Sequence, residues 1–328
     1  MTRTVGELFD ISGSNYPLYT KNDEGLLVAS EQFIQSPEYM ADFVPQIDEN
    51  YKFNPEDLRI IALAYISKTP AYIYGHAGVG KTTLIEQFCA RTKRPYFRVQ
   101  HTVGLEESNI IGQWVVRNGE TQFELGPLPY AMKHGMVYCA DEYDFAQPAV
   151  LSLYQAVLEG KPLIIKEADL ANRVIKPHPE FRFFATGNTN GTGDNTGLYQ
   201  GTSIQNMANY ERFGIVHMVD YMPEVFEREI LLKKTPLSRY YQKNAGATNG
   251  IIDSVMRFAQ QMRMKFNEGV VDFAPSIRVL VNAVNVGWSL GDIKAGFKLA
   301  YSNRMTPESK MEVDKVAEQY IIEVGDSK

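Results

Sequence analysis

The sequence predicts an α/β fold, in which a five-stranded parallel sheet carries two β-hairpin inserts and is followed by a helical segment. The first observation is that five short apolar or β-branched segments recur in the first two thirds of the 328-residue chain. Longer polar or helix-like stretches separate them, as in a parallel sheet whose strands are connected by helices. The second observation is that helical periodicity alone continues after residue 221. The expected strands are residues 71–74, 96–100, 136–140, 181–186 and 215–219.

The same pattern divides the chain into three regions. Residues 1–45 are rich in Asn, Ser, Tyr and Pro without a clear period, so this N-terminal extension is expected to lack regular structure. Residues 46–221 form the expected α/β domain, and residues 222–328 form the expected helical domain. A helix over residues 55–67 leads into the first strand, because a proline directly follows a suitable N-cap residue, Asn54.

Two hairpin signals interrupt the α/β pattern. Residues 112–125 contain Asn118-Gly119 between alternating segments, which favours a type I′ turn because both central residues need positive φ. Residues 163–175 are expected to form a second hairpin with a loop of about four to five residues. Inserts on a rigid scaffold often carry function, and surface padding without function is the alternative.

Composition and charge exclude several classes of protein. Hydrophobic residues make up 44% and charged residues 22% of the chain, as in a globular protein rather than a disordered or fibrous one. Lys+Arg 33 against Asp+Glu 39 gives a net charge of −6, which provides no overall field to attract nucleic acid or an anionic membrane. We therefore expect neither nucleic acid nor a membrane as the main partner.

The cysteines and the apolar runs indicate where the protein works. Cys89 and Cys139 both lie in apolar segments and are expected to be buried thiols, not a disulfide framework. No apolar run approaches the roughly 18 residues that can span a bilayer, and the first residues lack a signal-peptide pattern. The expected localisation is cytoplasmic.

A phosphate-binding motif follows the first expected strand. Residues 75–82, GHAGVGKT, match GxxxxGK[ST] between a strand and a helical stretch, which is the context that the motif requires. Its glycines let backbone N–H groups surround phosphate oxygens, Lys81 would reach the β- and γ-phosphates, and the Thr82 hydroxyl would ligate Mg²⁺. A purely structural Gly-rich turn is the alternative. The expected nucleotide-binding residues are Gly75, His76, Ala77, Gly78, Val79, Gly80, Lys81, Thr82 and Thr83.

An acidic pair follows the third expected strand. Residues 136–142, MVYCADE, place Asp141 at the carboxyl end of a buried strand, where ligands of open α/β folds bind. Asp141 would hold Mg²⁺ together with Thr82, and Glu142 would orient or deprotonate the water that attacks the γ-phosphate. An ordinary strand end is the alternative, but the phosphate-binding motif upstream favours a hydrolytic NTPase that uses ATP and Mg²⁺.

Five motifs in order, namely GHAGVGKT, CADEYD, FFATGNT, YERF and APSIR, resemble those of the AAA+ ATPases of the MoxR type. The segment GDNTGLYQGT at residues 193–202 is similar to that of the CobS-type ATPase subunits of aerobic cobaltochelatase. The resemblance runs from about residue 44 to the C-terminus. It implies a P-loop AAA+ core in the α/β domain, a helical lid in residues 222–328, and ATP and Mg²⁺ as cofactors.

The resemblance also implies catalytic roles for residues outside the two motifs. Asn188 matches sensor 1, Arg212 matches an arginine finger that acts on the ATP of a neighbouring subunit, and Arg278 matches sensor 2 of the lid. The alternatives are a turn-capping asparagine, a surface ion pair and a solvated helix arginine. With Lys81 and Glu142, these residues complete the expected catalytic set.

Assembly and partners follow from the same resemblance. The two hairpins match the helix-2 and pre-sensor-1 inserts, which tend to face the pore of a ring or a partner. Relatives form rings, usually hexamers, and pair with a protein bearing a von Willebrand factor A domain, which is CobT in the chelatase. The expected function is therefore an ATPase ring that remodels or activates a protein client, with a metal chelatase as the specific version.

Two other functions are weighed against this one. The first is a DNA-directed AAA+ motor of the helicase or loader type, which the mixed charges of the hairpins disfavour. The second is a P-loop kinase for a small metabolite.

Overall fold

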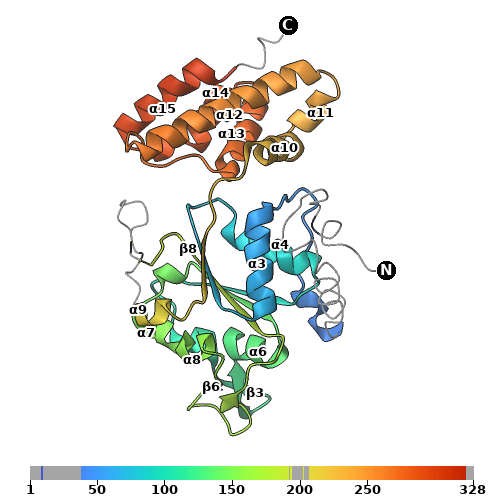
Figure 1. The fold of residues 1–328 in the computed structure, drawn as a ribbon, viewed down its shortest axis with the longest axis vertical. Coiled ribbons are helices and arrows are strands. Elements are labelled where there is room, and N and C mark those ends of the chain that lie inside the picture. The colour runs from blue at the N-terminus through green and yellow to red at the C-terminus, as the bar shows by residue number, and fades with distance from the viewer. Residues whose placement is uncertain (1–8, 10–37, 192, 194–201, 203–206, 323–328) are drawn as a thin grey trace. The chain divides into compact units, whose positions relative to one another are not determined.

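The computed structural model describes residue 9 and residues 38–191, 193, 202 and 207–322. The described residues group into two compact units. The first unit spans Met1–Asp48, Phe53–His76 and Gly80–Val219, and the second spans Glu49–Lys52, Ala77–Val79 and Asp220–Lys328. Figure 1 shows the sheet of the first unit and the helices of the second. The boundary at residue 222 that the sequence suggests stays a prediction.

A five-stranded parallel sheet forms the centre of the first unit, as predicted. Its strand order is β2-β5-β8-β1-β9, so strands that are distant in sequence lie side by side. Because all five strands run in the same direction, their carboxyl ends meet at one edge of the sheet. The strands are β1 (Ala71–Tyr74), β2 (Tyr96–Gln100), β5 (Val137–Asp141), β8 (Arg182–Gly187) and β9 (Ile215–Met218).

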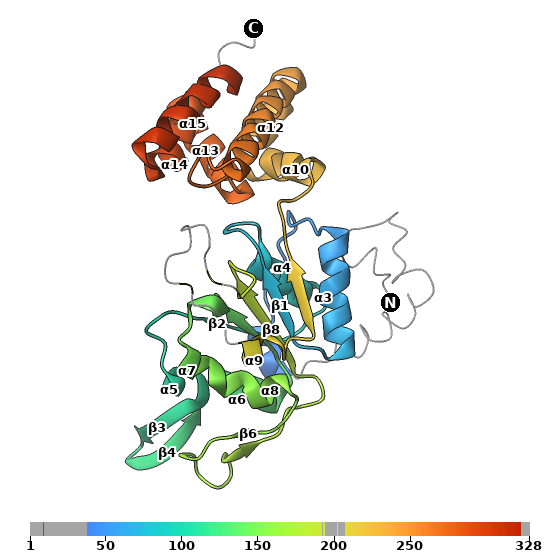
Figure 2. The same cartoon turned by 60° about the vertical axis from the view of Figure 1, so that its left-hand side comes forward.

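Helices cover both faces of this sheet. Figure 2 shows α3 (Pro55–Ser67) on one side and α6 (Pro127–His134) with the short helices α7 (Pro148–Leu151) and α8 (Gln155–Leu158) on the other. The helix α3 begins as expected, because the Asn54 side chain accepts a hydrogen bond from the Glu56 N–H at 3.0 Å. Within residues 38–191 and 207–219, the other helices of this unit are α4 (Lys81–Arg91), α5 (Glu107–Ile111), α9 (Met207–Tyr210) and the 3₁₀ turns η1 (Glu38–Phe43), η2 (Tyr143–Phe145) and η3 (Ser152–Tyr154).

Residues 1–45 were expected to lack regular structure, yet residues 38–43 form the 3₁₀ helix η1. Its Met40 is fully buried against the core of the α/β unit, so tertiary packing stabilises a turn that has no periodic signal in the sequence. Most of the other residues of this N-terminal region lie outside the described residues.

The first insert is the predicted hairpin of β3 (Gly112–Arg117) and β4 (Glu120–Leu125). Asn118 and Gly119 both have positive φ, 53° and 81°, as a type I′ turn requires. The second hairpin, β6 (Leu163–Ile164) and β7 (Val174–Ile175), is shorter than predicted. Residues 165–173 form its loop instead of four to five residues, because the Asp169 carboxylate accepts hydrogen bonds from Asn172 and stabilises a local turn there.

The second unit contains only helices among its described residues. Its core packs Phe258 of α12 against Phe297 of α14, with ring centroids 4.6 Å apart. The helices are α10 (Glu224–Lys234), α11 (Leu237–Tyr241), α12 (Ala245–Asn267), α13 (Ile277–Leu290), α14 (Ile293–Ala300) and α15 (Pro307–Tyr320), with the 3₁₀ turn η4 (Ser302–Arg304). Nowhere in the described chain does a helix have the length and apolar character that crossing a membrane requires.

Candidate active site

The predicted phosphate-binding loop connects β1 to α4 and has the backbone that its glycines allow. Gly75 and Gly80 have φ of 150° and 99°. A Cβ atom on Gly75 would lie 2.1 Å from the carbonyl oxygen of Val219, so only glycine fits there. Gly80 is the N-cap of α4 and has no side chain to cap it. The first turn of α4 therefore begins directly at the loop, as in sites that bind phosphate.

Lys81 is buried at this loop and connects it to the predicted Asn188. Its Nζ donates hydrogen bonds to the carbonyl oxygens of Gly75 at 2.7 Å and His76 at 3.0 Å. It also donates to the Asn188 side-chain oxygen at 3.0 Å. Asn188 directly follows β8, the neighbour of β1 in the sheet. The fold thus brings together two predicted site residues that are far apart in the sequence.

The Asp141 carboxylate lies at the end of β5 and is held by three side chains. Its Oδ1 accepts a hydrogen bond from the Thr82 hydroxyl at 2.5 Å and another from the Thr186 hydroxyl. Its Oδ2 accepts from Arg98 of β2, with Nε at 2.8 Å and a second guanidinium nitrogen also in contact. Burial alone would raise the pKa of Asp141, but these donors outweigh burial and hold it below its ordinary value. Asp141 is therefore a charged carboxylate at neutral pH.

Glu142 follows Asp141 in an unusual backbone conformation. Its φ and ψ are 54° and 42°, a left-handed geometry that is rare for a residue other than glycine. Its N–H donates to the Thr186 hydroxyl at 3.2 Å, and its carboxylate accepts from the Gln100 amide at 2.7 Å. Such strain persists where the surroundings enforce it, often at functional sites.

Asp144 is a buried acid that contacts the backbone at Asn188 and Thr189. Its Oδ2 accepts hydrogen bonds from the N–H groups of Asn188 at 2.8 Å and Thr189 at 3.0 Å, and from the Thr189 hydroxyl at 3.2 Å. Burial raises the pKa of Asp144 above its ordinary value although these donors act in the opposite direction. Its Oδ1 is buried and has no hydrogen-bond partner in the described part of the chain. Asp144 therefore fixes the backbone that carries the Asn188 side chain.

The two predicted arginines lie in different units. Arg212 precedes β9 in the first unit, and its Nε pairs with Glu159 at 2.7 Å while another guanidinium nitrogen donates to the Ala208 carbonyl. Arg278 is exposed in the first turn of α13 in the second unit. Most of the segment at residues 193–202, which carries part of the family resemblance, lies outside the described residues.

Four residues of the site were not predicted from the sequence: Arg98, Gln100, Thr186 and Asp144. The first two alternate in β2 and so share one face of the strand. Gln100 pairs in register with Asp141, which places this face beside the acidic pair. Two long polar side chains at alternate positions of a strand could have indicated these site residues, but only if the strand order had been known.

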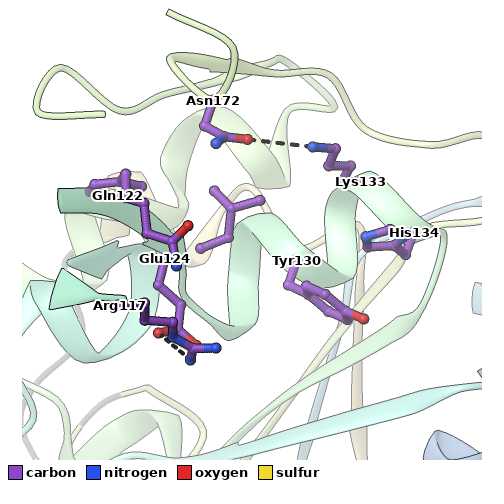
Figure 3. Close-up of a pocket in the computed structure, with 9 residues that line it drawn as sticks. Arg117, Gln122, Glu124, Tyr130, Lys133, His134 and Asn172 are labelled. Carbon is purple, nitrogen blue, oxygen red and sulfur yellow. Dashed lines mark hydrogen bonds and ion pairs between the residues drawn. The ribbon is translucent and has the colours of Figure 1, made fainter. Parts of the chain in front are cut away.

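A pocket of about 390 Å³ lies elsewhere, between the first hairpin and α6 (Figure 3). Its Arg117 donates to Glu124 at 2.8 Å, and its Lys133 donates to Asn172 at 3.4 Å. Two of its charged side chains thus pair with each other and the third bonds to an amide, and none of the predicted site residues lines the pocket. Within the described residues, no group of three or more His, Cys, Asp or Glu side chains could hold a metal ion.

Comparison with known proteins agrees with the geometry at the sheet edge. The model of the AAA domain, dynein-related subfamily, matches residues 70–200. The aerobic cobaltochelatase subunit CobS of Sinorhizobium sp. is 33% identical over 328 residues, covering 97% of this chain and 89% of that protein. Midasin of Dictyostelium discoideum is 27% identical over 289 residues, covering 84% of this chain and 5% of that protein. The chain therefore belongs to the AAA+ ATPase family, in the group that includes the cobaltochelatase subunit CobS.

Proposed function

We propose that this protein hydrolyses ATP with Mg²⁺ and works in a ring oligomer that remodels or activates a partner protein. The observation that carries the proposal is the hydrogen-bonded cluster at the carboxyl edge of the sheet. There Lys81 bonds to Asn188, and Thr82 bonds to Asp141, with Glu142 next in the chain. These groups come from the ends of three adjacent strands, β1, β8 and β5. Each has the chemistry that phosphoryl transfer to water needs.

Lys81 and the amides of the loop bind the phosphates in this mechanism. The Lys81 ammonium now donates to two carbonyls and one amide oxygen, so it is already held beside the loop. Little reorganisation is needed for it to meet a phosphate oxygen instead, and preorganised charge is the main source of catalysis for this reaction.

Thr82 and Asp141 would hold Mg²⁺. They fit it because a hydroxyl and an ionised carboxylate, 2.5 Å apart, are the hard oxygen donors that Mg²⁺ prefers. Held there, Mg²⁺ would neutralise charge on the phosphates. The protein's part is to keep Asp141 ionised and turned with Oδ1 toward Thr82.

Glu142 and Asn188 would act on the attacking water. Glu142 accepts the proton of the water or orients it, and its hydrogen bond from Gln100 fixes the carboxylate in the resting geometry. Asn188 supplies a side-chain amide at the same edge, and Asp144 holds its backbone. The pair thus gives one proton acceptor and one orienting group for a single water.

Arg212 would act on the ATP of a neighbouring subunit. Its hydrogen bonds go to Glu159 and Ala208 and not to the cluster around Lys81 in its own chain. A second copy could supply Arg212 to this site, and such a shared site fits assembly into a ring, usually of six subunits in the ATPases that this chain resembles. Arg278 of the lid would be the second sensor of the γ-phosphate.

The partner would be a von Willebrand factor A domain protein of the CobT type, because this chain is similar over most of its length to a cobaltochelatase subunit. The two hairpins are suited to contact the partner or the client. The Trp114 indole N–H donates to the Glu167 carbonyl at 2.9 Å and joins the two inserts. The two hairpins also carry exposed apolar side chains, namely Val116, Ile164, Leu170 and Val174. The specific version of the proposal is that this protein is a subunit of a cobalt chelatase.

Release of inorganic phosphate from ATP tests the proposal. The purified protein should release phosphate with Mg²⁺ and without any added acceptor, which separates an ATPase from a metabolite kinase. Chelating Mg²⁺ should stop the reaction. Two results together would overturn the proposal. The first is that no phosphate is released even when the captured partner is present, and the second is that Lys81→Ala binds ATP as well as the wild type. Capture with Glu142→Gln and ATP identifies the partner and the client.

A further inference from the structure

The two oxygens of the Asp141 carboxylate have partners of different kinds. Oδ1 accepts from two neutral hydroxyls, those of Thr82 and Thr186. Oδ2 accepts from the Arg98 guanidinium through two of its nitrogens. Arg98 comes from the edge strand β2, and its side chain is 48% exposed, whereas that of Asp141 is 4% exposed. The carboxylate that would hold Mg²⁺ is thus already paired with a protein cation.

The orientation of Asp141 does not depend on Arg98 alone. The hydroxyls of Thr82 and Thr186 hold Oδ1 from the two other sides, and β5 is hydrogen-bonded between β2 and β8 along its length. Removing the guanidinium leaves these contacts in place. Removal of the guanidinium mainly takes away a positive charge beside the carboxylate. In a partly buried site such a charge strongly repels a second cation.

We propose that Arg98 lowers the Mg²⁺ affinity of the site by pairing with the Asp141 carboxylate. This inference rests on the proposed ATPase function. One carboxylate shared with a guanidinium attracts a dication weakly, because the two cations repel each other. Phosphate oxygens add the missing negative charge. Arg98 is a positioning residue in this scheme, since it acts through Asp141 and not on the substrate.

The two proposed protein ligands also agree with a weak metal site. They are the Thr82 hydroxyl and the Asp141 carboxylate, whereas Mg²⁺ prefers six oxygen ligands. A purely structural role for Arg98, fastening β2 to β5, is the competing explanation. That role adds little, because these strands already pair in register from Tyr96 opposite Val137 to Gln100 opposite Asp141.

Mn²⁺ binding to the ADP complex, measured by electron paramagnetic resonance of the free ion, tests the proposal without hydrolysis. Arg98→Met should bind Mn²⁺ about tenfold more tightly than the wild type, at the lower end of what one neighbouring charge does to a carboxylate. Arg98→Lys, which keeps the charge, should stay close to the wild type. Arg117→Met is the matched control, because it removes a guanidinium that pairs with Glu124 instead. Its Mn²⁺ affinity should be unchanged.

Equal or weaker Mn²⁺ binding in Arg98→Met than in the wild type would overturn the inference. Should Arg98→Met not fold, Arg98→Gln keeps a polar side chain on the edge strand and is expected to give the same result.

Asp141→Asn separates this inference from the proposed function. If the wild type binds Mn²⁺ with ADP only when Asp141 is intact, the metal site stands whatever the Arg98 variants do. If Asp141→Asn changes nothing, the metal site itself is wrong.

Discussion

Lys81 Nζ and Asn188 Oδ1 lie 3.0 Å apart although 107 positions separate these residues in the chain. Lys81 follows β1 and Asn188 follows β8, and Tyr74 at the end of β1 pairs in register with Gly187 at the end of β8. A strand order in which β8 lies beside β1 therefore joins the two motifs. Their contact is a direct consequence of the parallel sheet, and it fixes the lysine beside the loop.

The first prediction concerns Lys81. Lys81→Ala should lower ATP turnover by at least about 100-fold, because a preorganised cation at the transferred phosphate is typically worth that much or more. It should also weaken ATP binding, measured by titration calorimetry. Lys133→Ala is the control, because Lys133 is an exposed lysine of α6 that bonds to Asn172. Normal turnover in Lys81→Ala would contradict the phosphate-binding assignment.

The second prediction concerns the buried acid Asp144. Its raised pKa means that folding favours its protonated form, so this contribution to stability is present at low pH and is lost as pH rises through the folded-state pKa. Asparagine does not titrate. The Tm of Asp144→Asn relative to the wild type should therefore increase from about pH 4 toward neutrality.

The same variant should lose activity while it gains relative stability. A neutral side chain makes weaker hydrogen bonds to the N–H groups of Asn188 and Thr189, so turnover should fall roughly tenfold. Calorimetry at several pH values gives the first readout and phosphate release gives the second. A constant difference in Tm across this pH range would show that Asp144 does not titrate as its burial requires.

The sheet was predictable, as was the position of the glycine-rich motif and the acidic pair at strand ends, because their signals are local. Each strand is a short apolar run, and GHAGVGKT and the acidic pair lie directly at strand ends. Arg98 and Gln100 were not predictable, since their roles depend on β2 lying next to β5. The order of the strands is decided by the packing of the whole fold, and the segment YFRVQ at residues 96–100 contains no signal of it.

The second hairpin shows a different limit of sequence reasoning. Alternation in residues 163–175 suggests longer strands, but the Asp169 side chain bonds to Asn172 and forms a turn in competition with the strand ladder. Such side-chain turns are decided by a balance of hydrogen bonds worth about 1 kcal/mol each. A periodic pattern does not resolve differences of that size.

The third prediction concerns Glu142. Glu142→Gln should bind ATP but not hydrolyse it, because glutamine cannot accept the proton of the attacking water. Bound ATP should then hold subunits together, and light scattering should detect a larger particle with ATP than with ADP. Glu120→Gln, an exposed residue of the first hairpin, is the control and should hydrolyse ATP normally. Full turnover in Glu142→Gln would remove Glu142 from the mechanism.

The fourth prediction tests whether Arg212 acts on a neighbouring subunit. Arg212→Ala and Glu142→Gln should each be inactive alone, since each lacks one part of every site. A mixture should regain some phosphate release, because an interface can combine the intact Glu142 of one subunit with the intact Arg212 of the next. A mixture of Lys81→Ala and Glu142→Gln should stay inactive, because both residues act in the active site of their own chain. Every site in that mixture therefore lacks one of the two residues. Rescue in neither mixture would contradict action of Arg212 on a neighbouring subunit. Full activity of Arg212→Ala alone would make its pair with Glu159 an ordinary ion pair.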